Sequence, residues 1–383
     1  MLLALMASMV AAADPPPAVC QGRSPCTERS RQDAGKGDSG AALSVVHVQL
    51  GPHPDVADEF DACMREEHWL LAAGRAPRLL LEVCNDGYGA SGVGDDSITV
   101  KDNRFVHRRY GGSSWRWANQ TTLHLDPLQI RSTRTNSFHA AAPDHFRHDE
   151  TNYTTGALTT EWGSPVCDYT GRFDRIPMVK GLSVPATARL GSCAAQARAD
   201  GSRGYVTFGA PAASGADAGM WAVMTDETTL IIEVADDRWI TEADSWLYED
   251  HLELWVSMDD VDQHYGWACE THPAAQWAIR LNGAVVPAHQ ASGPPPAARV
   301  ASGPDGRRRV QVTLPAAPKG LTVVYSDSDD GQRQERLIAT SALTFNVQAS
   351  LGEMEAVAAC AVRDGLLEMQ PATPPPTGAV IHP

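Results

Sequence analysis

Tryptophan side chains suited to stacking on a ligand gather in the second half of the chain. Trp239 and Trp246 lie in an acidic loop between two alternating segments, and Trp267 follows a His-Tyr-Gly run. Flat aromatic faces bind the apolar face of a pyranose, and a polar side chain such as Glu253 binds its hydroxyls. We expect these four side chains to form a carbohydrate-binding site. The alternative is that the indole rings only pack over one end of the fold.

Carboxylates in the same loop fit a second kind of site. Asp236 and Asp237 open the loop, and Asp250 ends it. Carboxylate oxygens are ligands that calcium prefers, so these three residues predict a calcium ion at the base of the loop. Alternatively, their side chains cap turns of the backbone. A later acidic run is predicted to form a solvated turn: Asp327, Asp329 and Asp330.

Enzymatic chemistry is the competing class of function. Paired carboxylates hydrolyse glycosidic bonds, and the first half of the chain offers six candidates: Asp86, Asp95, Asp144, Asp149, Glu150 and Glu161. Their spacing selects no pair, and the chain contains neither a Gly-x-Ser-x-Gly elbow nor a His-Glu-x-x-His motif. Residues 138–150 also hold a histidine cluster: His139, His145 and His148. Metal binding, acid–base chemistry and a solvated loop are the alternatives for this cluster.

The segments on either side of the acidic loop alternate strictly. The residues that share one face are Leu230, Ile232 and Val234 in the first segment and Leu252, Leu254 and Val256 in the second. A period of two residues is typical of half-buried β-strands. The sequence therefore predicts two strands that hold the acidic loop between them.

This part of the chain resembles the carbohydrate-binding modules of family 9 and their DOMON-like relatives. The resemblance covers about residues 205–348 and rests on four pieces in order: paired acids at 236–237, an Asp-x-x-Glu-Leu strand at 250–254, a strand and turn at 276–283, and a strand and acidic turn at 320–331. It implies an antiparallel β-sandwich that binds sugar by aromatic stacking. The DOMON-like relatives imply a further alternative, haem binding, with Met258 and His264 as candidate axial ligands.

At 383 residues the chain is long for one domain, so we expect two. The fold is predicted to be mainly β: the C-terminal domain is an antiparallel sandwich, and the N-terminal domain is β-rich with one helix over residues 55–74, begun by Asp55 and ended by Gly74. The predicted regions are a signal peptide at 1–13, a disordered linker at 14–42, a β-rich domain of unknown family at 43–200, the sandwich at 201–360 and a Pro-rich tail at 361–383.

Net charge and the N-terminus indicate where the protein works. The formal net charge of -16 opposes tight binding to nucleic acid. No run of about 18 apolar residues predicts a transmembrane helix. The apolar N-terminus ends in three alanines at residues 11–13, which indicates a signal peptide, although no Lys or Arg precedes the apolar run. The sequence thus predicts a secreted or periplasmic protein.

Eight cysteines are scattered over the chain, and none forms a Cys-x-x-Cys motif. This pattern argues against zinc binding and favours structural disulfides in an oxidising compartment. We predict the local pairs Cys20–Cys26 and Cys167–Cys193; the alternative is buried free thiols in a cytosolic protein. Together with the resemblance, these features predict an exported carbohydrate-binding protein, accessory to polysaccharide breakdown, with calcium as the candidate cofactor. A glycosidase with an N-terminal catalytic domain and a haem-binding protein are the alternatives.

Overall fold

The structure is a computed structural model in which strands dominate. It describes residues 18–52, 64–85, 93–164, 169–198, 205–210, 218–258, 274–291, 293–343, 351–357 and 359–371. Within these ranges the helices are short 3-10 turns: η1 (Ala18–Cys20), η2 (Trp246–Tyr248) and η3 (Pro304–Gly306). No helix in this described part is long and apolar enough to cross a membrane. The prediction of a mainly β protein is confirmed.

The N-terminal sheet contains four antiparallel strands in chain order: β1 (Cys26–Lys36), β2 (Ala42–Pro52), β3 (Met64–Ala72) and β4 (Arg78–Asn85). Residues 26–36 belong to the predicted disordered linker, and that part of the prediction is wrong. Backbone hydrogen bonds to β2 hold this polar edge strand without any apolar alternation. Residues 64–72, predicted to end a helix, form β3 because β2 and β4 pair with it on both sides. The start of the predicted helix, residues 55–63, lies outside the described residues.

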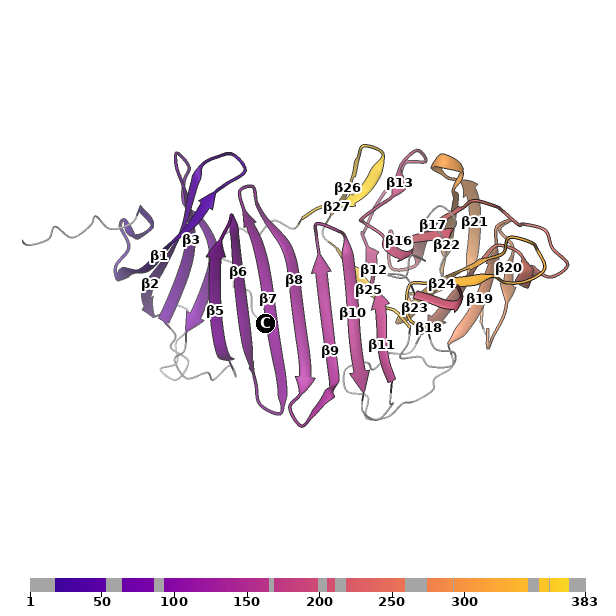
Figure 1. Ribbon diagram of the computed structural model, residues 1–383, viewed down its shortest axis with the longest axis horizontal. Coiled ribbons are helices and arrows are strands. Elements are labelled where there is room, and N and C mark those ends of the chain that lie inside the picture. Colours follow the sequence, from indigo (N-terminus) through magenta and orange to yellow (C-terminus); the bar gives the residue numbers. More distant parts are fainter. Residues whose placement is uncertain are drawn as a thin grey trace, which may run out of the picture.

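The middle of the chain forms one sheet of seven antiparallel strands, the meander sheet, drawn as a row of long arrows in Figure 1. Its strands are β5 (Val93–Lys101), β6 (Arg104–Gly112), β7 (Trp115–Leu125), β8 (Leu128–His139), β9 (Ala142–Asn152), β10 (Ala157–Ser164) and β11 (Tyr169–Asp174). Asp102 and Asn103 form the β5–β6 turn with positive φ angles, as a tight hairpin requires. Residues 138–150, for which a solvated loop was one alternative, lie mostly in β8 and β9.

Apolar side chains join the N-terminal sheet to the meander sheet. Leu43 and Val45 of β2 share a buried cluster with Phe105, Leu123 and Leu125 of β6 and β7. Burial of such side chains stabilises by roughly 25 cal/mol per Å² of apolar surface. The N-terminal sheet therefore packs against one end of the meander sheet through a shared apolar core.

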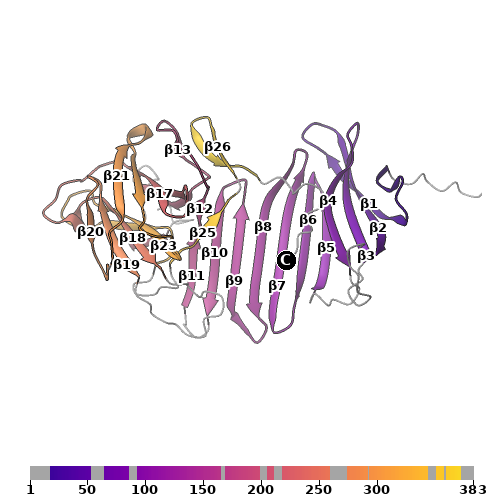
Figure 2. The same ribbon diagram turned by 180° about the vertical axis from the view of Figure 1, so that it is seen from behind.

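Two sheets in the second half of the chain form the sandwich. The first has the order β21-β22-β17-β16-β12-β25, with β14 pairing to β16, and the second has the order β15-β24-β23-β18-β19-β20. The strands are β12 (Ile176–Met178), β14 (Ala195–Arg198), β15 (Tyr205–Gly209), β16 (Ala218–Met224), β17 (Thr229–Asp236), β18 (His251–Ser257), β19 (Ala275–Arg280), β20 (Val285–Pro287), β21 (Ala297–Ser302), β22 (Arg308–Thr313), β23 (Gly320–Asp327), β24 (Arg336–Ala339) and β25 (Met354–Ala356). Figures 1 and 2 show the sandwich beside β11 and the N-terminal sheet beside β5, at opposite ends of an elongated molecule.

The alternating segments form the core of the sandwich as predicted. Leu230, Ile232 and Val234 of β17 are buried in one cluster with Leu252 and Leu254 of β18. Packing of two such faces is the defining feature of a sandwich, so the predicted antiparallel sandwich is confirmed. β12 departs from the antiparallel rule, because it pairs in parallel with both β16 and β25. β12 and β14 also precede residue 201, where the sandwich was predicted to begin.

A further, three-stranded sheet includes the C-terminal strands of the described chain. It combines β13 (Arg189–Leu190), β26 (Cys360–Arg363) and β27 (Leu366–Met369). Residues 361–369 therefore form strands, and the predicted tail is wrong for this part. The disulfide Cys20–Cys26 is confirmed, whereas Cys193 pairs with Cys360. The predicted partner Cys167 lies outside the described residues, and pairing of β13 with β27 brings Cys193 to the C-terminal strands instead.

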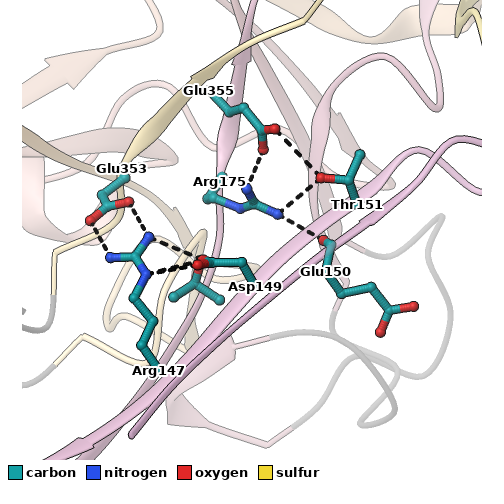
Figure 3. Close-up of polar contacts among 8 residues, drawn as sticks. Arg147, Asp149, Glu150, Thr151, Arg175, Glu353 and Glu355 are labelled. Atoms are coloured by element: carbon teal, nitrogen blue, oxygen red, sulfur yellow. Dashed lines mark hydrogen bonds and ion pairs between the residues drawn. The ribbon is translucent and has the colours of Figure 1, made fainter. Parts of the chain in front are cut away.

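A polar network, here called the joint, connects the meander sheet to the segment that starts β25 (Figure 3). Arg147 of β9 donates two hydrogen bonds to Glu353, of 2.9 and 2.8 Å, and further ones to Asp149. Arg175, which follows β11, forms an ion pair with Glu355. The planar fork of a guanidinium suits such two-pronged binding of carboxylates. The joint therefore fixes the last strand of the sandwich against the meander sheet.

Candidate functional site

The loop between β17 and β18, residues 237–250, is fixed at its ends. The Asp250 carboxylate accepts hydrogen bonds from the backbone N–H groups of Ile240 (2.6 Å) and Ser328 (2.9 Å). Close by, Glu249 accepts two hydrogen bonds from Arg280, of 2.8 and 2.7 Å. Hydrogen bonds to charged groups are stronger than neutral ones. The loop is thus a fixed part of the sandwich surface.

Carboxylates gather where this loop meets the sandwich, and we call them the acid cluster. Carboxylate oxygens of Asp236, Asp327 and Asp329 all lie within 4.8 Å of one another. Of the trio predicted from the sequence, Asp236 belongs to this cluster, Asp250 lies near enough to interact with it, and Asp237 is exposed. Asp327 is 1% exposed, so the predicted solvated turn is wrong for this residue. It is the last residue of β23, a strand that is buried along its whole length.

Burial raises the pKa values of these acids. It raises the pKa of Asp250 to about 8, and the negative charge of Asp236 adds to the shift. Burial and the Asp236 charge also raise the pKa of Asp327, against the opposing effect of Arg336, which lies 3.0 Å away. The pKa of Asp236 is likewise raised by burial, although the Tyr325 hydroxyl donates a hydrogen bond to it. Burial and the mutual repulsion of the acids, which Arg336 and Tyr325 only partly offset, therefore favour the protonated forms of these groups.

A hard divalent cation fits the acid cluster. The partners of the Asp327 carboxylate are Arg336, 3.0 Å away, and Asp236, which shares a side-chain hydrogen bond with it. One guanidinium faces several buried acids, and a divalent ion would add positive charge there and bring the raised pKa values down. Calcium prefers such oxygen ligands. Asp236, Asp327 and Asp329 are the residues able to hold it.

Aromatic side chains reach the surface on η2, within the same loop. Trp246 is half-buried, with its ring centroid 5.1 Å from that of His251, and Tyr248 is 37% exposed. Ser245 caps the turn by accepting a hydrogen bond of 3.4 Å from the backbone N–H of Leu247. We call Trp246 and Tyr248 the rim platform. A partly exposed ring held in place by its neighbours is suited to stacking on a sugar.

The other two predicted tryptophans are not brought to the rim platform by any described contact. Trp239 packs partly buried against the sandwich core, and the guanidinium carbon of Arg308 lies 5.4 Å from its ring centroid. Trp267 lies outside the described residues. Of the three predicted indole rings, Trp246 lies on the rim platform. Contact of each of the three with sugar stays a prediction.

Glu253 is placed inside the sandwich sheet rather than at its rim. It is 5% exposed, and its carboxylate accepts hydrogen bonds from the Trp255 indole (3.2 Å) and the Gln276 amide (2.8 Å). Its contact with a ligand stays a prediction. Sequence reasoning missed Tyr248, Asp327 and Asp329 as site residues. An aromatic residue two positions after Trp246 was the available signal for Tyr248, and the mostly apolar run at 320–325 was the signal for the burial of Asp327.

The acids considered for hydrolysis are divided between the two faces of the meander sheet. Glu150 pairs directly with Thr159, and Glu161 lies two positions beyond Thr159, so Glu150 and Glu161 share one face of the sheet. Asp149 lies on the opposite face, where it bonds to Arg147 in the joint. Asp95 and Asp144 are exposed, and Asp86 lies outside the described residues. The strand register therefore brings Glu150 and Glu161 to one face and keeps Asp149 away from them.

The described residues do not bring all three histidines of the predicted cluster together, and they do not test the predicted haem ligands. His139 and His145 both contact one indole ring, that of the first residue of β7. His148 is exposed on the opposite face of β9 from His145, because alternate residues of a strand face opposite ways. Met258 is exposed, and His264 lies outside the described residues. Haem binding by these two residues stays a prediction.

Comparison with known proteins finds solved structures that are similar to part of the chain. No family model matches the chain, and no curated protein matches it. Among solved structures, the chain is similar to a family 9 carbohydrate-binding module from Caldicellulosiruptor kristjanssonii in complex with cellotriose: 15% identity, coverage of 48% of this chain and 95% of that chain, and a TM-score of 0.32. It is also similar to that organism's family 9 module in complex with glucose: 14% identity, 48% and 97% coverage, and a TM-score of 0.33. Both belong to the family that residues 205–348 resemble in sequence.

Proposed function

We propose that the protein is an exported carbohydrate-binding protein whose rim platform stacks against a sugar ring. The observation that carries the proposal is the surface placement of Trp246 and Tyr248 on η2, beside the paired charges of Glu249 and Arg280. Aromatic faces bind the apolar side of a pyranose, and adjacent polar groups bind its hydroxyls. A platform fixed before binding loses little conformational entropy when the sugar arrives.

Calorimetric titration of the full chain with cellotriose and glucose tests this function. These sugars are the first choice because the similar structures are complexes with them. Trp246→Ala and Tyr248→Ala are each expected to weaken binding by about ten-fold or more. Phe208→Ala, which removes another exposed ring from β15, is the control and should bind as the wild type does. A glycan array extends the search, and binding to no glycan at all would reject the proposal.

The proposal includes calcium bound by Asp236, Asp327 and Asp329, with Asp250 close by. An ion there would fix the base of the loop that carries the rim platform. The proximity of the three carboxylates, the burial of Asp327 and the raised pKa values support it. Equilibrium dialysis of the full chain against calcium tests whether an ion binds.

Export is the remaining part of the proposal. The disulfides Cys20–Cys26 and Cys193–Cys360 support it, because structural disulfides persist in oxidising compartments. In that setting the protein would hold polysaccharide for breakdown by enzymes. Mass spectrometry of the protein recovered outside the cytoplasm should find a chain that starts after residue 13. Recovery of the whole chain in the cytoplasm, with reduced cysteines, would contradict export.

A further inference from the structure

A polar hollow of about 620 Å³ lies on the meander sheet, outside the site described above. Its floor comes from β8, β9, β10 and β11, and its wall from Ala194, Ala195 and Gln196 at the start of β14. Binding pockets for small molecules fall in the same range of volume, about 300–1,000 Å³. The hollow therefore has the size of a ligand site and a location in the part of the chain to which no function has been assigned.

Strand register gathers the side chains of the floor in two rows. Directly paired residues of neighbouring strands point to the same face of a sheet. The first row across the four strands is Arg134, Glu150, Thr159 and Asp174. The second row, two residues along, is Asn136, His148, Glu161 and Arg172. The floor thus presents a grid of alternating hydrogen-bond donors and acceptors.

The hollow is closed at one end by the β9–β10 turn. Gly156 in this turn has a φ of +73°, and a Cβ at this position would overlap the carbonyl group of Ser192. Only glycine allows so close an approach of two backbones. The β9–β10 turn and the segment before β14 consequently lie in direct backbone contact, and together they bound this end of the hollow.

The joint holds the floor from behind. Arg175 donates a hydrogen bond of 2.8 Å to the backbone carbonyl of Glu150, and Thr160 donates one of 2.6 Å to Asp149. Figure 3 shows the Glu150 side chain pointing away from Arg147 and Arg175, toward the opposite face of the sheet. The backbone beneath the hollow is therefore fixed before any ligand binds, which favours binding.

The chemistry of the lining selects an uncharged, hydroxyl-rich ligand. Arg134 lies 3.0 Å from Glu150, and Arg172 lies 3.4 Å from Glu161, so both guanidinium groups already have carboxylate partners. Sugar hydroxyls both donate and accept, and they suit such paired groups without the desolvation that a charged ligand would require. We propose that this hollow is a second carbohydrate site, which binds a short neutral oligosaccharide by hydrogen bonds alone.

The test uses the full chain carrying Trp246→Ala and Tyr248→Ala, so that the rim platform no longer contributes. Calorimetric titration with cellotriose, xylotriose and maltotriose should still detect binding of at least one of these neutral trisaccharides. Adding Arg172→Ala should weaken that binding by about ten-fold, the loss expected for charge-assisted hydrogen bonds. The matched control is Arg108→Ala, on the same face but at β6, two strands beyond β8. This control should leave the affinity within about two-fold.

A blocking variant, Thr159→Trp, gives a second readout when it is added to the same rim variant. The indole ring would occupy the floor of the hollow, so the trisaccharide binding that remains without the rim platform should be lost. Thermal melting verifies that each variant is folded. Absence of trisaccharide binding to the folded rim variant, survival of that binding with both Arg172→Ala and Thr159→Trp, or tighter binding of trigalacturonic acid would each overturn the proposal. None of these outcomes depends on whether the rim platform binds sugar.

Discussion

At the scale of single residues, the acid cluster links stability to pH and, in the proposed calcium site, to the bound ion. Asp250 and Asp327 have raised pKa values because burial disfavours their charged forms. The folded chain consequently holds protons on these groups at pH values where the unfolded chain has released them. The proposed divalent ion would replace those protons by a stronger neutralising charge.

The first prediction is that calcium stabilises the protein more at pH 8 than at pH 5. An acid whose folded pKa lies above its unfolded value of 3.8 stabilises the folded state less and less as pH rises toward about 8, because ionisation then favours the unfolded state. The unfolding temperature measured in a chelator should therefore fall between pH 5 and pH 8. Added calcium should recover most of this loss, by mass action on the folded state.

Asp327→Asn provides the residue-level check of that prediction. The amide removes one buried negative charge, so the calcium-dependent rise in unfolding temperature should become much smaller. Asp330→Asn, at an exposed position in the following turn, should leave the rise unchanged. An equal response of the two variants would place any calcium effect elsewhere.

Single residues also show what the sequence can and cannot predict about the site. The acidic loop, Asp236 and Trp246 were predicted from residue type and position. Asp327 was not, because its burial depends on where the end of β23 lies relative to β17. Tyr325 makes this contact by donating a hydrogen bond to Asp236, across 89 residues of sequence. No local pattern encodes a contact of that kind.

At the scale of elements, strands were predictable where one face is buried and the other is polar. β17 and β18 satisfy that condition. β1 does not, because nearly all of its side chains are exposed, and β8 and β9 carry polar residues on both faces of the meander sheet. Backbone pairing holds these strands in place, with both neighbours for β8 and β9 and with β2 for the edge strand β1. An alternation of polarity is therefore not required.

A second prediction concerns the β9–β10 turn. Gly156→Ala should lower the free energy of unfolding by about 3 kcal/mol, through a left-handed φ and overlap with the Ser192 carbonyl. Gly181→Ala is the matched control, since Gly181 has the same φ of +73° but no atom within 4 Å of an added Cβ. Gly181→Ala should lower the free energy of unfolding by about 1 kcal/mol, from the backbone strain of the left-handed φ alone. Urea unfolding of both variants measures the difference.

A third prediction concerns the outer face of β17. Glu233 is fully buried and accepts hydrogen bonds from Arg307 (2.7 Å) and Arg309 (2.9 Å). Glu233→Ala leaves these guanidinium groups without their carboxylate, so the free energy of unfolding should fall by about 3 kcal/mol. Glu227→Ala removes a largely exposed partner of Lys180 and should change it by less than about 0.5 kcal/mol. A small effect of Glu233→Ala in urea unfolding would mean that water replaces the lost partner.

At the scale of the whole molecule, the joint makes the meander sheet and the sandwich depend on each other. Arg147 and Glu353 are separated by 206 positions, and Cys193 and Cys360 by 167. The sequence predicted two domains joined in series, because hydrophobic patterns report local structure and carry no signal for such distant pairs. For the same reason, the sequence did not predict that β12, β14 and β25 belong to one sheet of the sandwich.

The fourth prediction tests this dependence. Arg147→Ala leaves Asp149 and Glu353 without their shared partner, and the free energy of unfolding should fall by about 3 kcal/mol. Hydrogen exchange should rise at both β9 and β25, since each loses the contact that fixes it. Arg31→Ala, which removes a half-exposed partner of Glu28, is the control and should leave exchange at both strands as it was. A rise confined to one of the two strands would argue against a shared joint.

The parallel pairing of β12 with β25 also means that this sheet can complete its folding only after the C-terminal strands have been synthesised. A nascent chain leaving the ribosome has β12 and β16 long before the residues of β25 are translated. Until then the β12 side of that sheet is an unpaired edge, and such an edge accepts strands from neighbouring chains. Transport of the chain unfolded across a membrane, with folding begun only after the last strands arrive, would spare the cell that aggregation.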